Sequence, residues 1–600
     1  MRPSAWSLAV LAAASDVSSL AFTNEKQYRL GPNAKAQLEK KPGTTHETKP
    51  DVSWLSCELS RPMDPSEDGL VSSDDLFSGG DAIETLAKRH QPFVQIPSVC
   101  YDDLGDVDED ERWKPFREIP DLMKETYPTV HKYAAVETIN QLGLVYTVKG
   151  SDDSLAPILL TAHQDVVPVE EETLDRWEYP PFGGYYNKST GYLYGRGSSD
   201  KSAITAMMSA MEALLSQQDY QPTRTVVFAF GFDEECSGRR GAGEISKHLQ
   251  ERYGEDGIAV IIDEGGAGLE KVGDTLYALP AVYEKGYLDV WFDLSVVGGH
   301  SATPTPNTAI GMMADVVIAL EDNPFSPQIL ENGPVHEGLV CFTRYTPRAL
   351  PALTQMIRWG DLRGAAQLWA KVSPEKQYSI QTSQAVGSFC GGNKITSLPE
   401  FVSMGVNHRF APQDSVGGIQ HRIAKLAYGV ARKYNLQVEA FKGDRDYMQY
   451  LEAHDISPES ETPRPFWEPE YSGKLILEAR EKHYPTPVSP TKGHVWDIFT
   501  GTIRHSLAQQ DTNVVPAPGA MTGNTDTRHY LDLTRNIYRW SPGSLKSFGN
   551  IHGINEKLLM SEHVNMAKFY YDFIRNFDQA NAYDQEMKEM KKAKQMRKDL

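Results

Sequence analysis

Residues 157–169, PILLTAHQDVVPV, place a histidine and an aspartate directly after a short apolar run. The run at residues 158–160 predicts a buried strand. Side chains two residues apart in an extended segment share one face, so His163 and Asp165 can point together into a site at the end of that strand. A metal-binding histidine usually donates its other ring N–H to a carboxylate, and Asp165 could accept it if the strand end curls back. By itself, the pair also fits a surface histidine beside a surface aspartate.

Other acidic residues and one histidine also follow predicted strands or lie in nearby loops: Asp200, Glu234, Glu235, Asp263 and His552. The predicted strands alternate with helical patterns, and the clearest of them are residues 142–148, 158–160, 225–230 and 258–262. This alternation predicts an α/β catalytic domain with a mixed, mostly parallel sheet and helices on both faces. In such sheets the ligand site lies beyond the carboxyl ends of the strands, where these residues gather.

The pattern changes near residue 287, where residues 288–294 alternate like a half-buried antiparallel strand. The strand and helix order that follows predicts an inserted α+β lid or dimerisation domain. We therefore divide the chain into six regions: 1–21 as signal peptide, 22–75 as a poorly ordered lead-in, 76–286 as the first segment of the catalytic domain, 287–442 as the inserted lid domain, 443–580 as the second segment of the catalytic domain, and 581–600 as a polar tail.

The N-terminus has the outline of a secretory signal peptide, with Arg2, an apolar run at residues 8–14 and a small-x-small site at residues 19–21. A signal-anchor or a poorly ordered tail is the alternative. One N-glycosylation sequon begins at Asn187, and no segment reaches transmembrane length. We therefore expect a glycoprotein of the secretory pathway, in a vacuolar or lysosomal lumen or outside the cell.

The net charge of −21 argues against a nucleic-acid partner, which would require a basic surface. The five cysteines form no zinc-finger pattern, and their odd number leaves at least one free or paired between chains. Zinc binds histidine nitrogen and carboxylate oxygen, and two-metal hydrolases share a bridging ligand between their ions. Adjacent Glu234 and Glu235 at the end of a buried strand would suit a metal ligand beside a base. Each fragment is weak alone, but together they predict a two-metal centre.

The chain resembles the co-catalytic zinc peptidases of the aminoacylase/carboxypeptidase superfamily, specifically the carboxypeptidase S-like branch of Gly-Xaa carboxypeptidases. The resemblance covers roughly residues 95–575. The segments that carry it are residues 163–169, 177–184, 195–200, 231–235, 263–266, 299–301, 407–409, 523–528 and 551–553.

The resemblance implies two Zn²⁺ ions per subunit, held by His163, Asp200, Glu235, Asp263 and His552. Asp200 would bridge the ions, with His163 and Asp263 completing one site and Glu235 and His552 the other. The resemblance also implies three catalytic roles: Glu234 as general base, Asp165 orienting His163, and His300 stabilising the oxyanion. The substrate carboxylate would be held by Arg409, Asn407, Asn524, Thr525 and Arg528. In the family the histidine at position 300 can come from a partner subunit, which allows a homodimer through the inserted domain.

The implied function is a zinc-dependent carboxypeptidase that hydrolyses the C-terminal peptide bond of short peptides by a metal-activated water. An N-acyl-amino-acid amidohydrolase is the alternative, because both substrates carry an amide next to a free carboxylate. A non-catalytic binding protein that kept the fold is a third alternative. One departure bears on it: the family reads Asp-x-Lys after the Gly-Arg-Gly loop, whereas Asp200 and Lys201 are adjacent here.

Overall fold

A computed structural model describes residues 56–579, apart from residues 219, 458–472 and 509–511. The expected signal peptide at residues 1–21, most of the lead-in and the polar tail at residues 581–600 lie outside the described residues. Within those residues, no helix combines the length and the apolar character that crossing a membrane requires.

The larger sheet has eight strands and is mixed, as predicted. Its order is β1 (Ala135–Ile139), β2 (Gly143–Val148), β6 (Val226–Gly231), β3 (Ile158–His163), β7 (Val260–Ala267), β20 (Ile537–Ser541), β10 (Ala281–Glu284) and β19 (Gly519–Met521). The four central strands, β6, β3, β7 and β20, are parallel neighbours. Every residue of β3 and β6 is buried, which explains why these strands read as unbroken apolar runs.

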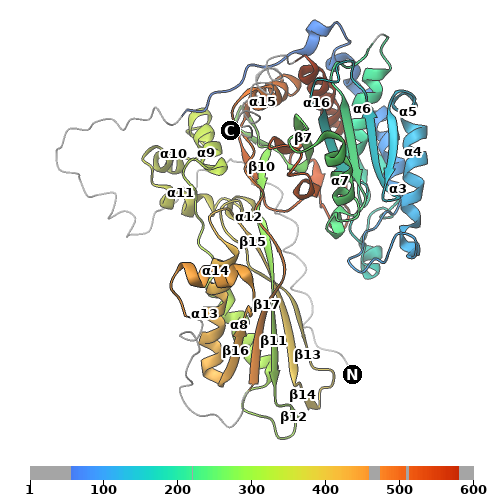
Figure 1. The fold of residues 1–600 in the computed structure, drawn as a ribbon. Coiled ribbons are helices and arrows are strands. Elements are labelled where there is room, and N and C mark those ends of the chain that lie inside the picture. The colour runs from blue at the N-terminus through green and yellow to red at the C-terminus, as the bar shows by residue number, and fades with distance from the viewer. Residues whose placement is uncertain (1–55, 219, 458–472, 509–511, 580–600) are drawn as a thin grey trace, which may run out of the picture. The chain divides into compact units, whose positions relative to one another are not determined.

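Helices cover both faces of this sheet (Figure 1). One core contains α3 (Gly79–Gln95), α6 (Ser202–Leu215), α15 (His494–Ser506) and α16 (Met560–Asp578). A second core on the other face contains α7 (Ala242–Tyr253). Nearly every residue of α6 is buried, which its alanine- and methionine-rich sequence permits on all sides.

The second sheet has five strands, in the order β13 (Ala385–Gly391), β15 (Phe401–Phe410), β11 (Gly286–Val296), β17 (Gly473–His483) and β16 (Leu436–Ala440). Two helices pack on it, α8 (Ala309–Glu321) and α13 (Val416–Tyr434). This is the predicted inserted α+β fold. The sheet also takes in β17, which lies beyond residue 442, where the sequence interpretation ended the domain. That strand belongs here because it pairs with β11 along its length and buries Leu475 and Leu477.

Some of the region expected to be a poorly ordered lead-in is packed. Cys57 forms a disulfide with Cys341, and Asp68 pairs with Arg575 at 2.5 Å. One contact is covalent and one is ionic, so residues 56–75 can be held in place although their sequence has no long apolar pattern. Cys341 belongs to a helical group inside the insertion: α9 (Pro334–Tyr345), α10 (Pro351–Arg358), α11 (Leu362–Trp369) and α12 (Pro374–Tyr378).

The remaining elements are short. The helices are α2 (Ser73–Leu76), α4 (Ile119–Thr126), α5 (Pro128–Tyr133) and α14 (Arg445–Ala453), and the 3₁₀ turns include η2 (Glu111–Glu118), η4 (Glu234–Cys236) and η6 (Asp526–His529). There are three small sheets in the described residues. The first pairs β12 (Gly299–His300) with β14 (Ser397–Leu398), and the second has the order β18 (Asn513–Pro516), β9 (Thr275–Ala278) and β8 (Leu269–Val272). The third has the order β21 (Phe548–Gly549), β22 (Lys557–Leu559), β5 (Tyr192–Tyr194) and β4 (Tyr185–Asn187).

Candidate metal centre

The candidate site lies where β3 and β6 end, beside the neighbouring strand β7. His163 is the last residue of β3 and pairs in register with Gly231, the last residue of β6. The chain after Gly231 therefore passes beside His163 and turns into η4, which carries Glu234 and Glu235. Parallel neighbouring strands bring these residues to one edge of the sheet, as the sequence predicted.

Among the described residues, two groups of three side chains bring their ligand atoms within 4.8 Å of one another. The first group is His163, Glu234 and Glu235, and the second is Asp200, Glu235 and His552. In the second group, His552 Nε2 lies 2.9 Å from Glu235 Oε1 and 3.5 Å from Asp200 Oδ1. Glu235 is common to both groups, so the two donor sets adjoin one another.

Asp165 connects the two halves of this edge. One of its carboxylate oxygens lies 3.1 Å from His163 Nδ1 and also accepts a hydrogen bond from the backbone N–H of Glu234. The other oxygen accepts the backbone N–H of Glu235 at 2.9 Å. Asp165 therefore holds both the His163 ring and the turn that carries the two glutamates.

Asp263 and Glu264 occupy different depths of the sheet. Asp263 pairs in register with Thr161, two residues before His163, and is fully buried. Two residues of strand span about 6.6 Å, so Asp263 starts well below the His163 ring. Glu264 is one residue further along, and its Oε1 lies 2.9 Å from His163 Nε2. Asp263 is in neither donor group, and Glu264 was not among the residues predicted from the sequence.

The electrostatics of both histidines are set by carboxylates. Burial opposes protonation of His163, but the Glu264 and Asp165 carboxylates outweigh it and hold the pKa of this imidazole well above its ordinary value. Hydrogen bonds to the Asp200 and Glu235 carboxylates raise the pKa of His552 to about 11.

His552 has a φ of 58°, a left-handed conformation uncommon for a residue other than glycine. The surrounding loop therefore holds this side chain in a costly conformation.

Carboxylates outnumber cationic groups in this cluster. Burial, reinforced by the neighbouring Glu235 carboxylate, raises the pKa of Glu234 well above its usual range. A buried charge is costly unless it is paired or bound to a metal. Divalent cations would offset this concentration of negative charge, and nitrogen plus carboxylate oxygen is the donor set that zinc takes. The residues present therefore fit a centre of two divalent ions.

The loop before α6 places Asp200 in the cluster. Glu556 is completely buried, lies 2.5 Å from Arg196 and accepts the backbone N–H groups of Gly197 and Ser199. Arg196 also donates to the backbone carbonyl of His552. The loops that carry Asp200 and His552 are therefore joined through one buried ion pair, which no sequence pattern had indicated.

The residues expected to hold the substrate carboxylate divide into two sets. Arg409 donates to Asn524 Oδ1 at 2.7 Å, and its guanidinium lies 4.8 Å from the centre of the Tyr287 ring. Asn407 instead donates to Asp289, on the neighbouring strand. Arg409 and Asn524 thus come together although they lie far apart in the sequence, whereas Asn407 belongs to a cross-strand pair.

Thr525, Arg528 and His300 also differ in their surroundings. The Thr525 hydroxyl donates to the buried Glu284 carboxylate at 2.6 Å, which is a core contact. Arg528 belongs to η6 in the same loop, and its positive charge adds to burial in lowering the pKa of His483. His300 is exposed, and its Nδ1 accepts the backbone N–H of Ala302. Neither donor group includes His300.

Asp526 is a buried residue of the 523–528 loop, which the resemblance assigned to the substrate carboxylate, but it was not among the residues named for that role. Neither of its carboxylate oxygens has a hydrogen-bond partner among the described residues. The carboxylate fits between Gly231 and Gly238, where a Cβ on either glycine would overlap its oxygens. The two glycines beside the glutamate pair were the signal that could have indicated a close neighbour there.

Known proteins resemble this chain over most of its length. The model described as "Peptidase family M20/M25/M40" matches residues 159–576. An uncharacterized carboxypeptidase of Schizosaccharomyces pombe is 35% identical over 555 residues, covering 90% of this chain and 88% of its own. Carboxypeptidase S of Saccharomyces cerevisiae is 34% identical over 551 residues, covering 89% and 91%. Human carnosine dipeptidase 1 shares the fold, with a TM-score of 0.57 at 14% identity over 86% of this chain and 100% of its own. The chain belongs to peptidase family M20/M25/M40, which confirms the resemblance.

Proposed function

We propose that this chain is a zinc-dependent carboxypeptidase that hydrolyses the C-terminal peptide bond of short peptides. The observation that carries the proposal is the pair of adjoining donor groups at the strand ends, with Glu235 common to both. Similarity to carboxypeptidase S over 89% of the chain supports the same activity.

The proposed ligands are those implied by the family pattern. Asp200 would bridge two zinc ions, Glu235 and His552 would complete one site, and His163 with a carboxylate from the 263–264 pair would complete the other. When bound, the two ions would lower the pKa of a water molecule and polarise the scissile carbonyl. The family pattern makes Asp263 the further ligand beside His163, whereas the structure has Glu264 Oε1 2.9 Å from His163 Nε2.

Glu234 is the proposed general base. Its carboxylate accepts a proton from the attacking water and gives it to the nitrogen of the leaving amine. Asp165 suits the task of fixing this base, because one carboxylate oxygen accepts the Glu234 backbone N–H and lies beside His163. Burial raises the pKa of Glu234 well above its usual range, which makes it a stronger proton acceptor than an ordinary glutamate.

Arg409 is the proposed anchor of the substrate's terminal carboxylate. Its guanidinium is steadied by Asn524 and Tyr287, and it forms no ion pair with a protein carboxylate among the described residues. A guanidinium fork suits bidentate binding of a carboxylate. His300 is proposed to stabilise the oxyanion. Its exposure is compatible with a contribution across a subunit interface formed by the inserted domain.

The secretory location, glycosylation at Asn187 and the homodimer also belong to this proposal. Asn187 lies at the end of the short strand β4, where its Oδ1 accepts the backbone N–H of Ser189. The location and the glycosylation rest on the N-terminal pattern and the sequon. N-terminal sequencing and glycosidase treatment of the secreted protein test them.

A single experiment tests the activity. Zinc per chain is measured on purified protein, together with hydrolysis of free dipeptides, the same dipeptides amidated at the C-terminus, and N-acyl amino acids. We expect two zinc ions and cleavage of dipeptides but not of their amides. Preference for N-acyl amino acids would establish the amidohydrolase alternative, and absence of zinc would favour a non-catalytic binding protein.

A further inference from the structure

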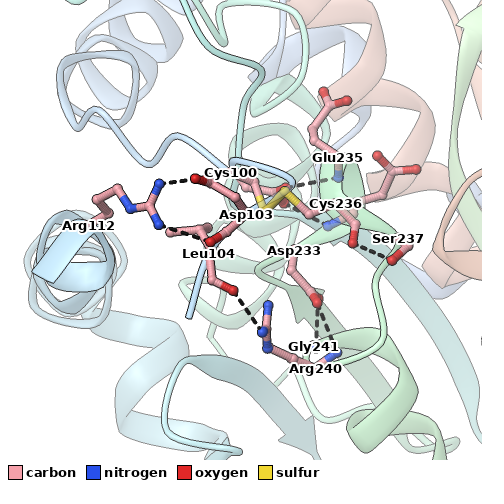
Figure 2. Close-up of a disulfide and its surroundings, with 12 residues drawn as sticks. Cys100, Asp103, Leu104, Arg112, Asp233, Glu235, Cys236, Ser237, Arg240 and Gly241 are labelled. Atoms are coloured by element: carbon pink, nitrogen blue, oxygen red, sulfur yellow. Dashed lines mark hydrogen bonds and ion pairs between the residues drawn. A yellow bond between two sulfur atoms is a disulfide. The ribbon is translucent and has the colours of Figure 1, made fainter. Parts of the chain in front are cut away.

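A disulfide lies directly beside the proposed metal centre (Figure 2). It joins Cys236, the residue after Glu235, to Cys100, which lies 136 residues earlier in the chain. Glu235 and Cys236 are consecutive residues of the three-residue turn η4. A covalent bond is thus attached one residue away from the side chain common to both donor groups.

The disulfide closes a ring of three chain segments. The Cys100 backbone N–H donates to the carbonyl of Val166 at 3.0 Å, and Val99 and Val166 form a parallel bridge. Val166 follows Asp165, whose carboxylate accepts the Glu235 backbone N–H at 2.9 Å. Hydrogen bonds therefore connect Cys100 to the end of β3 and the end of β3 to η4, and the disulfide connects η4 back to Cys100.

The turn itself has little support of its own. Within and just after η4, the Cys236 N–H bonds to the carbonyl of Asp233 and the Ser237 N–H to that of Glu234. Ser237 has a φ of 84°, which is costly for a residue with a side chain. A turn this short is fixed by its surroundings, and Arg240, which donates to the Leu104 carbonyl, adds a second link to the segment after Cys100 (Figure 2).

We propose that the Cys100–Cys236 disulfide is a positioning element of the metal centre, which holds the Glu235 carboxylate in place as a ligand of the ion that it shares with His552. This inference rests on the proposed function. Groups that orient metal ligands typically change metal affinity by about 10- to 100-fold when they are removed. Cys100 lies before residue 159, where the match to the family model begins, and Cys236 lies within it, so the disulfide joins a segment outside the matched region to one inside it.

The chain supplies a matched control in its second disulfide, Cys57–Cys341. Cys57 is in the N-terminal segment and Cys341 in α9, and neither is adjacent in sequence to a proposed ligand. Both bonds close long loops, of 136 and 284 residues, so their removal lowers stability through the unfolded chain in similar ways. Only one of them should change how zinc binds.

The test compares Cys100→Ala/Cys236→Ala with Cys57→Ala/Cys341→Ala and wild type. Alanine leaves no thiol at these positions that could bind metal in place of a carboxylate. Zinc affinity is measured by competition with a chelator, and the ligand geometry by the visible spectrum of the cobalt-substituted protein. We expect the first variant to bind one ion about 10- to 100-fold more weakly and to show an altered cobalt spectrum. The control pair should match wild type in both.

A second route starts from folded protein that has its disulfide in place, in case the first variant does not fold. In the Cys57→Ala/Cys341→Ala control, a phosphine reductant is oxidised to its phosphine oxide with oxygen from water, while the Cys100–Cys236 disulfide is reduced to two thiols, which are then alkylated. Weakened binding of one ion after this treatment supports the inference. Wild-type affinity for both ions in the reduced protein, or in the first variant, overturns it. A wild-type protein that binds no zinc overturns the proposed function and this inference with it.

Discussion

The inserted domain should lose stability in mild acid because of one buried histidine. His408 on β15 is completely buried, and its ring meets that of Phe325 edge to face with centroids 6.0 Å apart. Burial lowers the pKa of His408 from 6.5 to about 4, although the neighbouring backbone opposes the shift. In the unfolded chain His408 becomes protonated below about pH 6.5. In the folded domain it stays neutral down to about pH 4. The free energy of unfolding should fall by about 3 kcal/mol between pH 7 and pH 4 from this group alone.

Comparison with His408→Leu isolates that contribution, because leucine fills a similar volume and does not titrate. Differential scanning calorimetry at pH 7, 6, 5 and 4 gives the melting temperature of each protein. The wild type should lose about 6–10 °C relative to the variant over this range, since about 1 kcal/mol corresponds to a few degrees in a domain of this size. Parallel curves for the two proteins would refute the reasoning, because they would show that His408 has the same pKa in both states.

Three further predictions concern the metal centre. Glu234→Gln should keep both zinc ions and lose turnover by at least about 100-fold, because an amide cannot accept the proton from water, and zinc content with kcat measures both. Zinc stoichiometry of Asp263→Asn and Glu264→Gln separates the two carboxylates near His163: loss of zinc in only one of them names the ligand. His300→Ala should lower kcat by about 100- to 1,000-fold with little change in KM, whereas Arg409→Ala should mainly raise KM. Loss of zinc from His300→Ala, or wild-type kinetics in that variant, would contradict the oxyanion role.

The sheet edge that carries the site was predictable because its strands are strongly patterned. The apolar runs before His163 and Glu234 are buried on both faces, and runs of this kind are what parallel central strands require. Once these strands are neighbours, the residues after them must meet. Asp200, Glu235 and His552 came together as the family pattern implied, although His552 stands in a loop with no periodicity of its own.

The features that escaped prediction depend on register and on contacts between distant segments. Whether Asp263 or Glu264 reaches His163 depends on how far β7 is displaced along β3, and no local pattern encodes this displacement. The strand β17 was missed because charged residues fill much of its exposed half. The two disulfides join residues 136 and 284 positions apart, and five cysteines permit many pairings.

The loop in which Asp200 and Lys201 are adjacent still brings Asp200 into the proposed metal centre. Lys201 turns inward, where its ammonium donates to the backbone carbonyls of Phe93 and Ile96 at the end of α3. Burial lowers the pKa of Lys201 to about 7, so this buried position disfavours the charged form of the lysine. On the other side of the loop, Glu556 accepts the backbone N–H groups of residues just before Asp200. With the loop fixed from both sides, α6 begins at Ser202, and the Asp200 carboxylate lies 3.5 Å from His552 Nε2.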